Sequence, residues 1–381
     1  MKIITVIGAR PQIIKASAIS REISKNYSNT ITEIIIHTGQ HYDKNMSEIF
    51  FDELSIPKPN YNLNVGSNSH GVQTAKMIEG IEEVLIKEKP DFIVLYGDTN
   101  STLAGAVAAS KINTPIVHIE AGLRSFNRKM PEEINRVVCD HLSTFLFSPT
   151  ATGYKNLLKE GFRRIHNKPY TPDNPGVFHC GDIMYDNSLH FAKLAKKKSM
   201  ILNDLELKPN EFVLTTIHRD HNTDFEENLV KIFEALIEIS KNYKVILPIH
   251  PRTRNKLDAL NNKTLFQTIK DQKNLKLIEP VSFLDMIQLE RNAKIVITDS
   301  GGVQKESYFF NKPCIILRPE TEWVEILETK MAKLVSANFN KIMAAFNDFI
   351  SKKEKTFPLI FGDGNAARFI CQKLFENQKN K

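Results

Sequence analysis

The sequence predicts an α/β protein with two doubly wound domains, and three observations support this prediction. The chain has 381 residues, enough for two hydrophobic cores at about 100–200 residues per domain. Short β-branched runs alternate with longer amphipathic stretches along most of its length. The β-branched runs are almost continuously apolar, which is typical of parallel strands that are buried on both faces of a sheet.

The strands and helices follow in order from this alternation. Buried strands are expected at residues 3–7, 33–37, 92–96, 115–119, 145–148, 212–217, 245–249, 276–278, 295–298 and 314–317. The helical pattern is clearest at residues 71–89, 101–111, 132–142 and 226–241. Repeated β-α units of this kind predict a parallel sheet covered by helices, the Rossmann-like architecture.

The alternation breaks once, and this break sets the expected domain boundary. Residues 164–175 contain three prolines and several Asn and Asp residues, a composition that favours a loop or linker. A helical stretch at 183–197 follows, and the β-α pattern restarts near Phe212. We therefore expect an N-terminal domain at 1–170, a linker and connecting helix at 171–205, and a second domain at 206–364. The last segment, 365–381, is expected to pack back on the first domain as a helix.

Composition excludes several classes of protein. With 41% hydrophobic residues the chain is too apolar to be disordered, yet no apolar stretch approaches the ~20 residues of a membrane helix. The N-terminus has no signal-peptide pattern, and four scattered cysteines without a CxxC pair favour a reduced, cytoplasmic protein. The net charge of +7 comes from lysine runs without interleaved aromatics. It predicts a solvated surface and attraction of a small anion rather than nucleic acid.

Polar segments follow many of the expected strands. They occupy residues 8–15, 37–41, 97–100, 120–124, 218–219, 250–252 and 299–302. Ligands of open α/β sheets bind beyond the carboxyl ends of the strands, so these segments predict a ligand cleft between the two domains. A single polar strand end often only caps a helix. The recurrence of such ends in both domains favours the cleft.

The segment Asp299-Ser300-Gly301-Gly302 follows a strand and opens a helix. Two glycines permit close approach of a ligand, and the free amides of a helix start attract phosphate. Glu306, about one turn later, is placed to accept hydrogen bonds from ribose hydroxyls. The alternative is a tight turn with a capping serine. The segment has neither the GxGxxG spacing of a dinucleotide site nor a P-loop, which weighs against NAD and ATP.

The first strand ends in a second candidate phosphate turn, Gly8-Ala9-Arg10-Pro11, in which Pro11 suits the first helical position. Arg10 and Lys15 supply positive charge there, although both could be ordinary surface charges.

Asp98, Glu120 and Glu132 form a set of carboxylates suited to proton transfer at carbon and to stabilising a developing cation. Each alone could be a cap or an ion-pair partner. His218 could contact a diphosphate or serve as an acid, although a lone histidine is more often structural. We expect no metal and no cofactor, because no cluster with metal-ligand spacing occurs in the sequence.

At these motifs the sequence resembles the non-hydrolysing UDP-N-acetylglucosamine 2-epimerases. The resemblance rests on an ordered set of segments, residues 8–15, 96–99, 118–124, 131–136, 147–150, 218–219, 298–306, 312–313 and 361–364. It implies two Rossmann-like domains in the GT-B arrangement with an interdomain active-site cleft, and a homodimer. It also implies a reaction without a metal or cofactor, in which a UDP-2-acetamido sugar is the substrate.

The resemblance also implies a role for each matching residue. Asp98, Glu120 and Glu132 match the catalytic acids, and His218 matches a histidine that contacts phosphate. The residues expected to bind the substrate are Arg10, Lys15, Arg124, Arg136, Ser300, Gly301, Gly302 and Glu306. The implied reaction eliminates UDP, with loss of the C2 proton, to leave 2-acetamidoglucal. UDP then adds back as C2 is protonated from the other face.

Two departures from the family pattern concern the substrate. The first turn reads Gly-Ala-Arg-Pro-Gln instead of Gly-Thr-Arg-Pro-Glu, and Trp323 stands where many relatives have an arginine. Both resemble the branch that acts on UDP-2,3-diacetamido-2,3-dideoxy-glucuronate, whose C6 carboxylate Arg124, Arg128 or Lys129 could bind. Open alternatives are a hydrolysing 2-epimerase, a retaining GT-B glycosyltransferase and a non-catalytic sugar-nucleotide binder.

Overall fold

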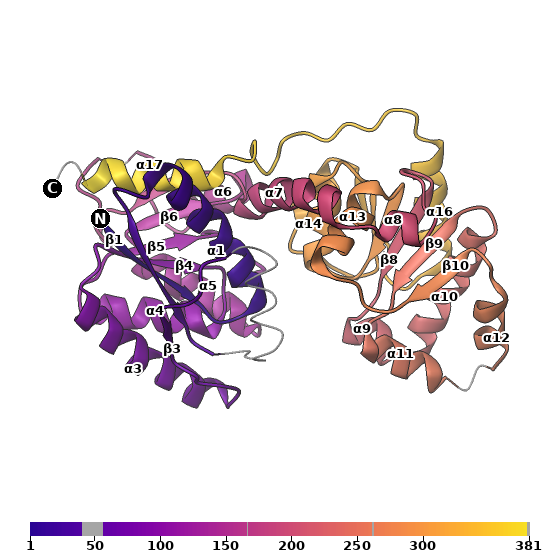
Figure 1. Ribbon diagram of the computed structural model, residues 1–381, viewed down its shortest axis with the longest axis horizontal. Coiled ribbons are helices and arrows are strands. Elements are labelled where there is room, and N and C mark those ends of the chain that lie inside the picture. Colours follow the sequence, from indigo (N-terminus) through magenta and orange to yellow (C-terminus); the bar gives the residue numbers. More distant parts are fainter. Residues whose placement is uncertain (40–55, 166, 261–262, 379–381) are drawn as a thin grey trace. The chain divides into compact units, whose positions relative to one another are not determined.

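The computed structural model describes residues 1–39, 56–165, 167–260 and 263–378. The chain divides into two compact units, one formed by Met1–Asn187 with Leu359–Lys381 and the other by Ser188–Pro358. Each unit is built on one parallel β-sheet with helices on both faces (Figure 1). The predicted α/β class with two Rossmann-like domains is therefore confirmed.

The N-terminal unit contains a seven-stranded sheet in the order β3-β2-β1-β4-β5-β6-β7. Its strands are β1 (Lys2–Ile7), β2 (Thr32–His37), β3 (Tyr61–Asn62), β4 (Phe92–Tyr96), β5 (Ile116–Ile119), β6 (Phe145–Ser148) and β7 (Gly176–His179). All neighbouring strands are parallel; in the register Ile4 of β1 pairs with Ile34 on one side and Ile93 on the other. The central strands are buried almost completely, as their apolar sequence predicts.

Two layers of helices cover this sheet. The layer of α3 (His70–Glu88), α4 (Asn100–Lys111) and α5 (Pro131–Leu142) packs side by side on one face (Figure 1). Its core includes Met77, Ile81 and the alanines of α4, which lie against Ile4 and Ile93 of the sheet. The other helices are α1 (Arg10–Glu22), which continues into a π-helical turn (Ile23–Tyr27), α6 (Ala151–Lys159) and α17 (Ala366–Gln378). The boundary between the two units falls within α7 (Ile183–Lys198).

The C-terminal helix α17 belongs to the N-terminal unit. Its Phe369 ring lies 6.4 Å from the Phe147 ring of β6 and 6.1 Å from the Phe178 ring of β7. Asp186 of α7 accepts hydrogen bonds from the first two amides of α17, those of Ala366 and Ala367, at 3.2 and 2.8 Å. The aromatic contacts and the capping carboxylate together hold this helix on the sheet.

The C-terminal unit contains a six-stranded sheet in the order β10-β9-β8-β11-β12-β13. Its strands are β8 (Phe212–Thr216), β9 (Lys244–Pro248), β10 (Leu275–Ile278), β11 (Ile295–Thr298), β12 (Cys314–Ile316) and β13 (Ala332–Leu334). The helices are α8 (Ile201–Asp204), α9 (Asp220–Thr223), α10 (Glu226–Ser240), α11 (Pro251–Asp258), α12 (Lys263–Asp271), α13 (Phe283–Asn292), α14 (Gly301–Phe309), α15 (Val324–Glu328) and α16 (Phe339–Ser351). One face of the sheet packs on α10 and α16, and the other on α13 and α14.

Three short strands, β3, β7 and β13, were not predicted. Each has only two to four residues, and each is paired at the outer edge of its sheet. The strand β7 lies within the segment 171–205 that was expected to be a linker and connecting helix. Its sequence Gly-Val-Phe-His follows Pro175, so local composition favours a loop, whereas pairing with β6 makes it a strand.

In both sheets the strand order reverses at one point, and this positions the candidate site. The reversal falls between β1 and β4 in the N-terminal sheet and between β8 and β11 in the C-terminal sheet. Loops that leave such neighbouring strands diverge, so their residues line an opening at the carboxyl edge of the sheet. The turns at Gly8, Gly97, His218 and Asp299 all follow these four strands.

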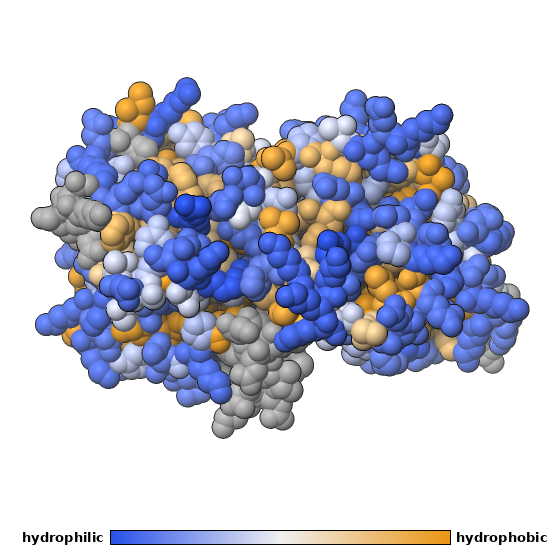
Figure 2. All heavy atoms as spheres, turned by 45° about the horizontal axis from the view of Figure 1, so that its top comes forward, coloured by the Kyte–Doolittle hydropathy of each residue, from blue (hydrophilic) through white to orange (hydrophobic). Residues whose placement is uncertain are grey.

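The surface is consistent with a charged protein. Figure 2 shows a face dominated by hydrophilic side chains, with apolar residues in small patches between them. None of the described helices is long and apolar enough to cross a membrane.

Candidate active site

The turn after β1 requires glycine at its first position. A Cβ atom on Gly8 would lie 2.1 Å from Ser101 Oγ of α4 and 2.3 Å from Thr38 Oγ1 after β2, both far inside van der Waals contact. The helix α1 starts at Arg10, whose side chain is exposed, and Pro11 occupies its first turn. Arg10, a candidate substrate-binding residue, thus directly follows a tightly packed turn.

Gln12 ties this turn to the end of β4. Its Oε1 accepts hydrogen bonds from the amides of Gly8 (2.9 Å) and Ala9 (3.2 Å). Its Nε2 donates to the carbonyl of Tyr96 (2.9 Å) and to Thr102 Oγ1 (3.1 Å). The side chain is fully buried, so both ends of the amide are satisfied within the protein. Sequence reasoning gave Gln12 no role beyond its departure from the family pattern.

Lys15 and Glu120 form an ion pair at this edge of the sheet. Lys15 Nζ donates to Glu120 Oε2, and the two side chains are only 15% and 6% exposed. Glu120 has a left-handed backbone with φ of 76°, an unusual conformation for a non-glycine residue and one that clusters at functional sites. Gly97 lies against this pair, because a Cβ atom on it would be 3.1 Å from both Lys15 Nζ and Glu120 Oε2.

Asp98 forms the second acid–cation pair. Its Oδ2 accepts from Arg136 Nη2 (2.8 Å) and Nε (3.1 Å), while its side chain stays 34% exposed. Its carbonyl accepts from Asn135 Nδ2 at 2.9 Å. In the first turn of α5 the neighbours differ: Glu133 is buried and pairs with Arg136 at 2.5 Å, whereas Glu132 is exposed. The structure thus places Asp98 directly after Gly97, Glu120 beside Gly97, and Glu132 at the solvent face of α5.

Arg124 has protein partners. Its Nε and Nη2 contact the two carboxylate oxygens of Glu160 at 2.7 Å, and Nη2 also lies 2.7 Å from Asp140 Oδ2. Its side chain is only 2% exposed. The expected contact of Arg124 with the substrate stays a prediction, and the structure adds a second role in holding Asp140.

In the C-terminal unit, Asp299 organises the turn after β8. This fully buried carboxylate accepts from the amides of His218 and Arg219 at 3.0 Å and from Asn222 Nδ2 at 3.0 Å. The His218 ring is held as well, with Nδ1 3.2 Å from Asp299 Oδ1. Burial lowers the pKa of His218 below its usual value, against the opposing charge of Asp299. Asp299 and Asn222 were not among the predicted site residues.

The turn after β11 presents the start of α14. Ser300 caps this helix by accepting from the Val303 amide, and a Cβ on Gly301 would lie 2.5 Å from Glu322 Oε1. Gly302 is open by comparison, since the nearest atoms to its Cβ position are Glu306 Oε2 and Ser300 Oγ at 3.9 Å. The structure therefore brings Ser300, Gly302 and Glu306 together at the N-terminus of α14, as predicted from the spacing.

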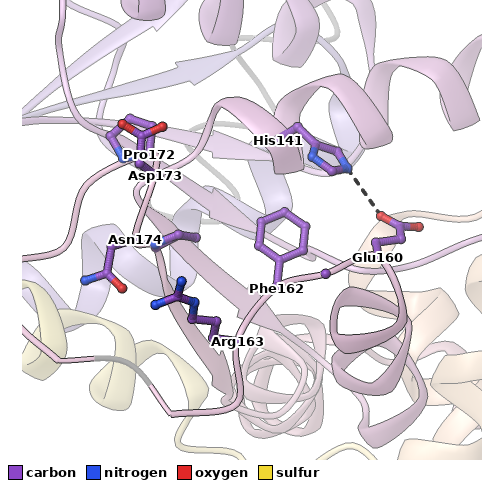
Figure 3. A pocket seen from close by; sticks show the side chains of 9 residues that line it. His141, Glu160, Phe162, Arg163, Pro172, Asp173 and Asn174 are labelled. Atoms are coloured by element: carbon purple, nitrogen blue, oxygen red, sulfur yellow. Dashed lines mark ion pairs between the residues drawn. The ribbon is translucent and has the colours of Figure 1, made fainter.

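Other features lie apart from these turns. A pocket in the N-terminal unit is lined by His141, Glu160, Gly161, Phe162, Arg163 and residues 172–175, and the side chain of Phe162 points toward His141 in it (Figure 3). Within the described residues, no group of three or more His, Cys, Asp or Glu side chains could hold a metal ion. Residues 40 and 41 of the polar segment 37–41 lie outside the described part of the chain.

The fold and these turns define a class of protein. A Rossmann-like sheet with a glycine-rich helix start at its switch point is typical of proteins that bind a phosphate-bearing nucleotide, and acid–cation pairs such as those in the N-terminal unit are suited to proton transfer. Each of these features is typical of enzymes that act on nucleotide-linked small molecules. The family model of UDP-N-acetylglucosamine 2-epimerase matches residues 23–375, and the chain belongs to this family of isomerases.

Similar proteins match nearly the whole chain. A UDP-N-acetylglucosamine 2-epimerase homolog of Methanococcus maripaludis is 52% identical, over 98% of this chain and 99% of that protein. The UDP-2,3-diacetamido-2,3-dideoxy-D-glucuronate 2-epimerase of Pseudomonas aeruginosa is 45% identical over the same shares. The crystal structure of Methanocaldococcus jannaschii UDP-GlcNAc 2-epimerase in complex with UDP-GlcNAc and UDP is similar with a TM-score of 0.80 and 42% identity, covering 99% of this chain and all of that one.

Proposed function

We propose that this protein inverts C2 of a UDP-2-acetamido sugar without net hydrolysis. The substrate pair is UDP-N-acetylglucosamine and UDP-N-acetylmannosamine, or their 2,3-diacetamido-glucuronate analogues. Family membership over nearly the whole chain supports the reaction class. The observation that supports the chemistry is the pairing of Glu120 with Lys15 beside Gly97 and of Asp98, the next residue, with Arg136.

The reaction has two balanced half-steps. In the first, the bond between C1 and the UDP oxygen breaks, UDP leaves with the bonding electrons, and a base takes the C2 proton to leave 2-acetamidoglucal. In the second, an acid returns a proton to the opposite face of C2 while the same UDP oxygen bonds to C1. Because the C2 proton is barely acidic, C1–O cleavage must run ahead of proton loss, which makes C1 cation-like.

The N-terminal unit supplies the groups for this chemistry. The carboxylates of Asp98 and Glu120 lie against Arg136 and Lys15, and in this proposal they stabilise positive charge at C1 and exchange the proton at C2. Glu132 is the third acid in this proposal, and its exposed position in the first turn of α5 leaves it accessible to a ligand.

The C-terminal unit holds the nucleotide in this proposal. The amides at the start of α14 and the side chain of Ser300 bind the diphosphate, Glu306 accepts hydrogen bonds from the ribose, and His218 donates to a phosphate oxygen. Arg10 of the N-terminal unit adds positive charge for the departing UDP anion. Stabilising that anion lowers the barrier to C1–O cleavage and retains UDP for the return step.

The identity of the sugar is the finer part of the proposal. The Pseudomonas aeruginosa enzyme named for the diacetamido-glucuronate sugar and the Methanocaldococcus jannaschii enzyme named for UDP-N-acetylglucosamine are 45% and 44% identical to this chain. Overall sequence identity therefore does not indicate which of the two sugars is the substrate. Gln12 and Trp323 favour the uronate branch, and both substrates belong in the first experiment. A homodimer is also proposed, for which light scattering should give twice the 43.5 kDa of one chain.

The test is proton exchange at C2. The protein is incubated in deuterated water with UDP-N-acetylglucosamine and, separately, with the diacetamido-glucuronate sugar nucleotide, and products are followed by NMR. We expect both C2 epimers to appear with deuterium at C2, while free UDP stays low. The variant Glu120→Gln, which keeps the shape of the side chain but not its charge, is the matched control and should show little exchange.

Each alternative predicts a different result. Accumulation of free N-acetylmannosamine with one equivalent of UDP would identify a hydrolysing enzyme. Transfer of the sugar to an added acceptor with its C2 proton retained would identify a glycosyltransferase. Tight UDP binding without exchange on either substrate would identify a binding protein and refute the proposal.

A further inference from the structure

The side chain of His118 lies next to the Gly97 turn of the candidate site, and no role was predicted for it from the sequence. It is on β5, two residues before Glu120, and it is completely buried. Its Nδ1 is 2.6 Å from Asp140 Oδ1 of α5, and its Nε2 is 2.8 Å from the carbonyl oxygen of Gly97. Both ring nitrogens therefore have short, defined partners.

These partners determine the protonation state of the ring. A peptide carbonyl only accepts hydrogen bonds, so Nε2 carries a hydrogen and donates to Gly97. The Nδ1 partner is a carboxylate whose other oxygen accepts from the Gly122 amide (3.1 Å) and lies 2.7 Å from Arg124 Nη2. The guanidinium favours the ionised form of Asp140, so Nδ1 also carries a hydrogen. His118 is then an imidazolium.

A chain of alternating charges makes this buried cation stable. It runs from His118 through Asp140 and Arg124 to Glu160, and successive charged atoms are 2.6 to 2.7 Å apart. Burial alone lowers the pKa of His118, but its interactions with the buried Cys139 and with Asp140, including the hydrogen bond to Asp140, raise that pKa well above its ordinary value. The four charges sum to zero, which a fully buried cation requires.

The hydrogen bond from Nε2 acts on the residue next to Asp98. Gly97 is in the left-handed region with φ of 63°, and its amide donates to the carbonyl of Ile119 at 3.0 Å. With His118 on its carbonyl as well, Gly97 is held on both sides, through the N–H of the Tyr96–Gly97 peptide and the carbonyl of the Gly97–Asp98 peptide. The orientation of the following residue, Asp98, and the distance from Gly97 to the Lys15–Glu120 pair both depend on this peptide.

We infer that His118 is a positioning residue of the proposed epimerase: as an imidazolium between Asp140 and the Gly97 carbonyl, it fixes the Gly97–Asp98 peptide so that Asp98 faces the sugar. This inference rests on the proposed function for its effect on catalysis. The protonation state itself is independent of that function and can be measured separately.

The first experiment observes the ring directly. The protein is labelled with ¹⁵N at its 11 histidines, and the His118 signals are assigned by their loss in His118→Gln. We expect both ring nitrogens to be protonated from pH 6 to pH 9, without a titration in that range. A ring nitrogen with the shift of an unprotonated imidazole at pH 7 would overturn the inference, whatever the protein catalyses.

The second experiment measures what the charge chain does for the reaction. Steady-state rates of C2 exchange are compared for wild type, His118→Gln, Asp140→Asn and the double variant. We expect kcat to fall about 100-fold in each single variant, because small misplacement of a catalytic group has effects of this size. KM and the Kd of UDP should change by less than about threefold, because neither residue contacts the ligand in this proposal.

Two comparisons separate positioning from a general loss of structure. Because His118 and Asp140 act through one hydrogen bond, the double variant should be no slower than the slower single variant. Multiplying effects would refute the inference, as would an unchanged kcat in Asp140→Asn. His141→Gln, which changes an exposed histidine 3.6 Å from Glu160, is the matched control and should keep the wild-type rate.

The outcomes are distinguishable from failure of the proposed function. If wild-type protein exchanges no C2 proton on either substrate, the epimerase proposal fails while the NMR result still decides the state of His118. If His118→Gln does not fold, the His118 signals are assigned by their change in Asp140→Asn, and that variant and the wild-type spectrum then decide the inference.

Discussion

Replacing Lys15 by Met tests whether the cation keeps Glu120 ionised for catalysis. In the native protein the two side chains are 15% and 6% exposed, and Lys15 Nζ contacts Glu120 Oε2 directly. Methionine has a similar length and no charge. The substitution therefore leaves a buried carboxylate without the positive charge of Lys15, and that disfavours the charged form.

The structure sets the size of the effect. Removing one partner of a buried ion pair costs about 3–5 kcal/mol, and the partial exposure of Lys15 places this pair near the lower end. At about 1.4 kcal/mol per pH unit, ~3 kcal/mol corresponds to ~2 pH units. The acidic limb of the pH–rate profile should therefore move up by ~2 units. The rate should fall by up to ~100-fold at pH values below the native limb, and this loss should shrink as the pH is raised past the shifted limb.

The assay is the rate of C2 deuterium incorporation at saturating substrate between pH 5 and pH 10. Lys15→Arg keeps the charge and should keep the native profile within about half a unit. Lys25→Met removes the same charge from an exposed position and should change nothing. If the Lys15→Met profile is slower than the native one but has the same shape, Lys15 acts on the substrate and not through Glu120, and the reasoning is wrong.

Three further predictions concern single residues. Glu120→Gln should keep the Kd of UDP within about threefold and lower kcat at least about 100-fold; near-native turnover would remove Glu120 from the catalytic set. Gln12→Glu should lower the free energy of unfolding by about 2 kcal/mol at pH 7.5 in urea titrations, because a carboxylate cannot donate to the Tyr96 carbonyl. The loss of stability should be smaller at pH 5, where a protonated carboxyl group can again donate to the Tyr96 carbonyl. An equal loss at both pH values would contradict this explanation. Burial lowers the pKa of His37 from 6.5 to about 4, so the unfolded chain is protonated at a higher pH than the folded protein. Neutral His37 therefore contributes about 3 kcal/mol to the free energy of unfolding, and this contribution should be lost as the pH falls from 6.5 to 4. In His37→Asn the free energy of unfolding should fall less between pH 6.5 and pH 4 than it does in wild type. If the two proteins lose stability equally over that range, His37 does not cause the loss.

Much of the fold could be predicted because its signals are local. The strands at 92–96, 145–148 and 295–298 were placed at their observed bounds, since a run of buried β-branched and aromatic residues has few other uses in an α/β protein. The strands β3 and β13 were missed because two or three residues at a sheet edge acquire their conformation from pairing. Their sequences contain no comparable apolar run.

At the candidate site, too, some features could be predicted from the sequence and others could not. Glu132 and Glu133 are adjacent and chemically alike, and the sequence pointed to Glu132. Helix α5 turns Glu133 inward onto Arg136 and leaves Glu132 exposed. Arg124 was expected to bind the substrate, which stays a prediction, and the structure adds that its guanidinium contacts Glu160 and Asp140. The charge of each residue was plain from the sequence, whereas the partner of that charge was not.

The sequence by itself determined the β-α alternation, the glycines and polar residues that end the strands, and the family to which they belong, because these depend on residue type and short spacing. Only the tertiary structure decided which charges neutralise one another. Lys15 meets Glu120 across 105 residues of chain, and His118 meets Asp140 and Gly97 across two neighbouring strands and a helix. Such pairs form only when the strand order of the sheet brings distant turns to one edge, and burial then makes each charge dependent on its partner.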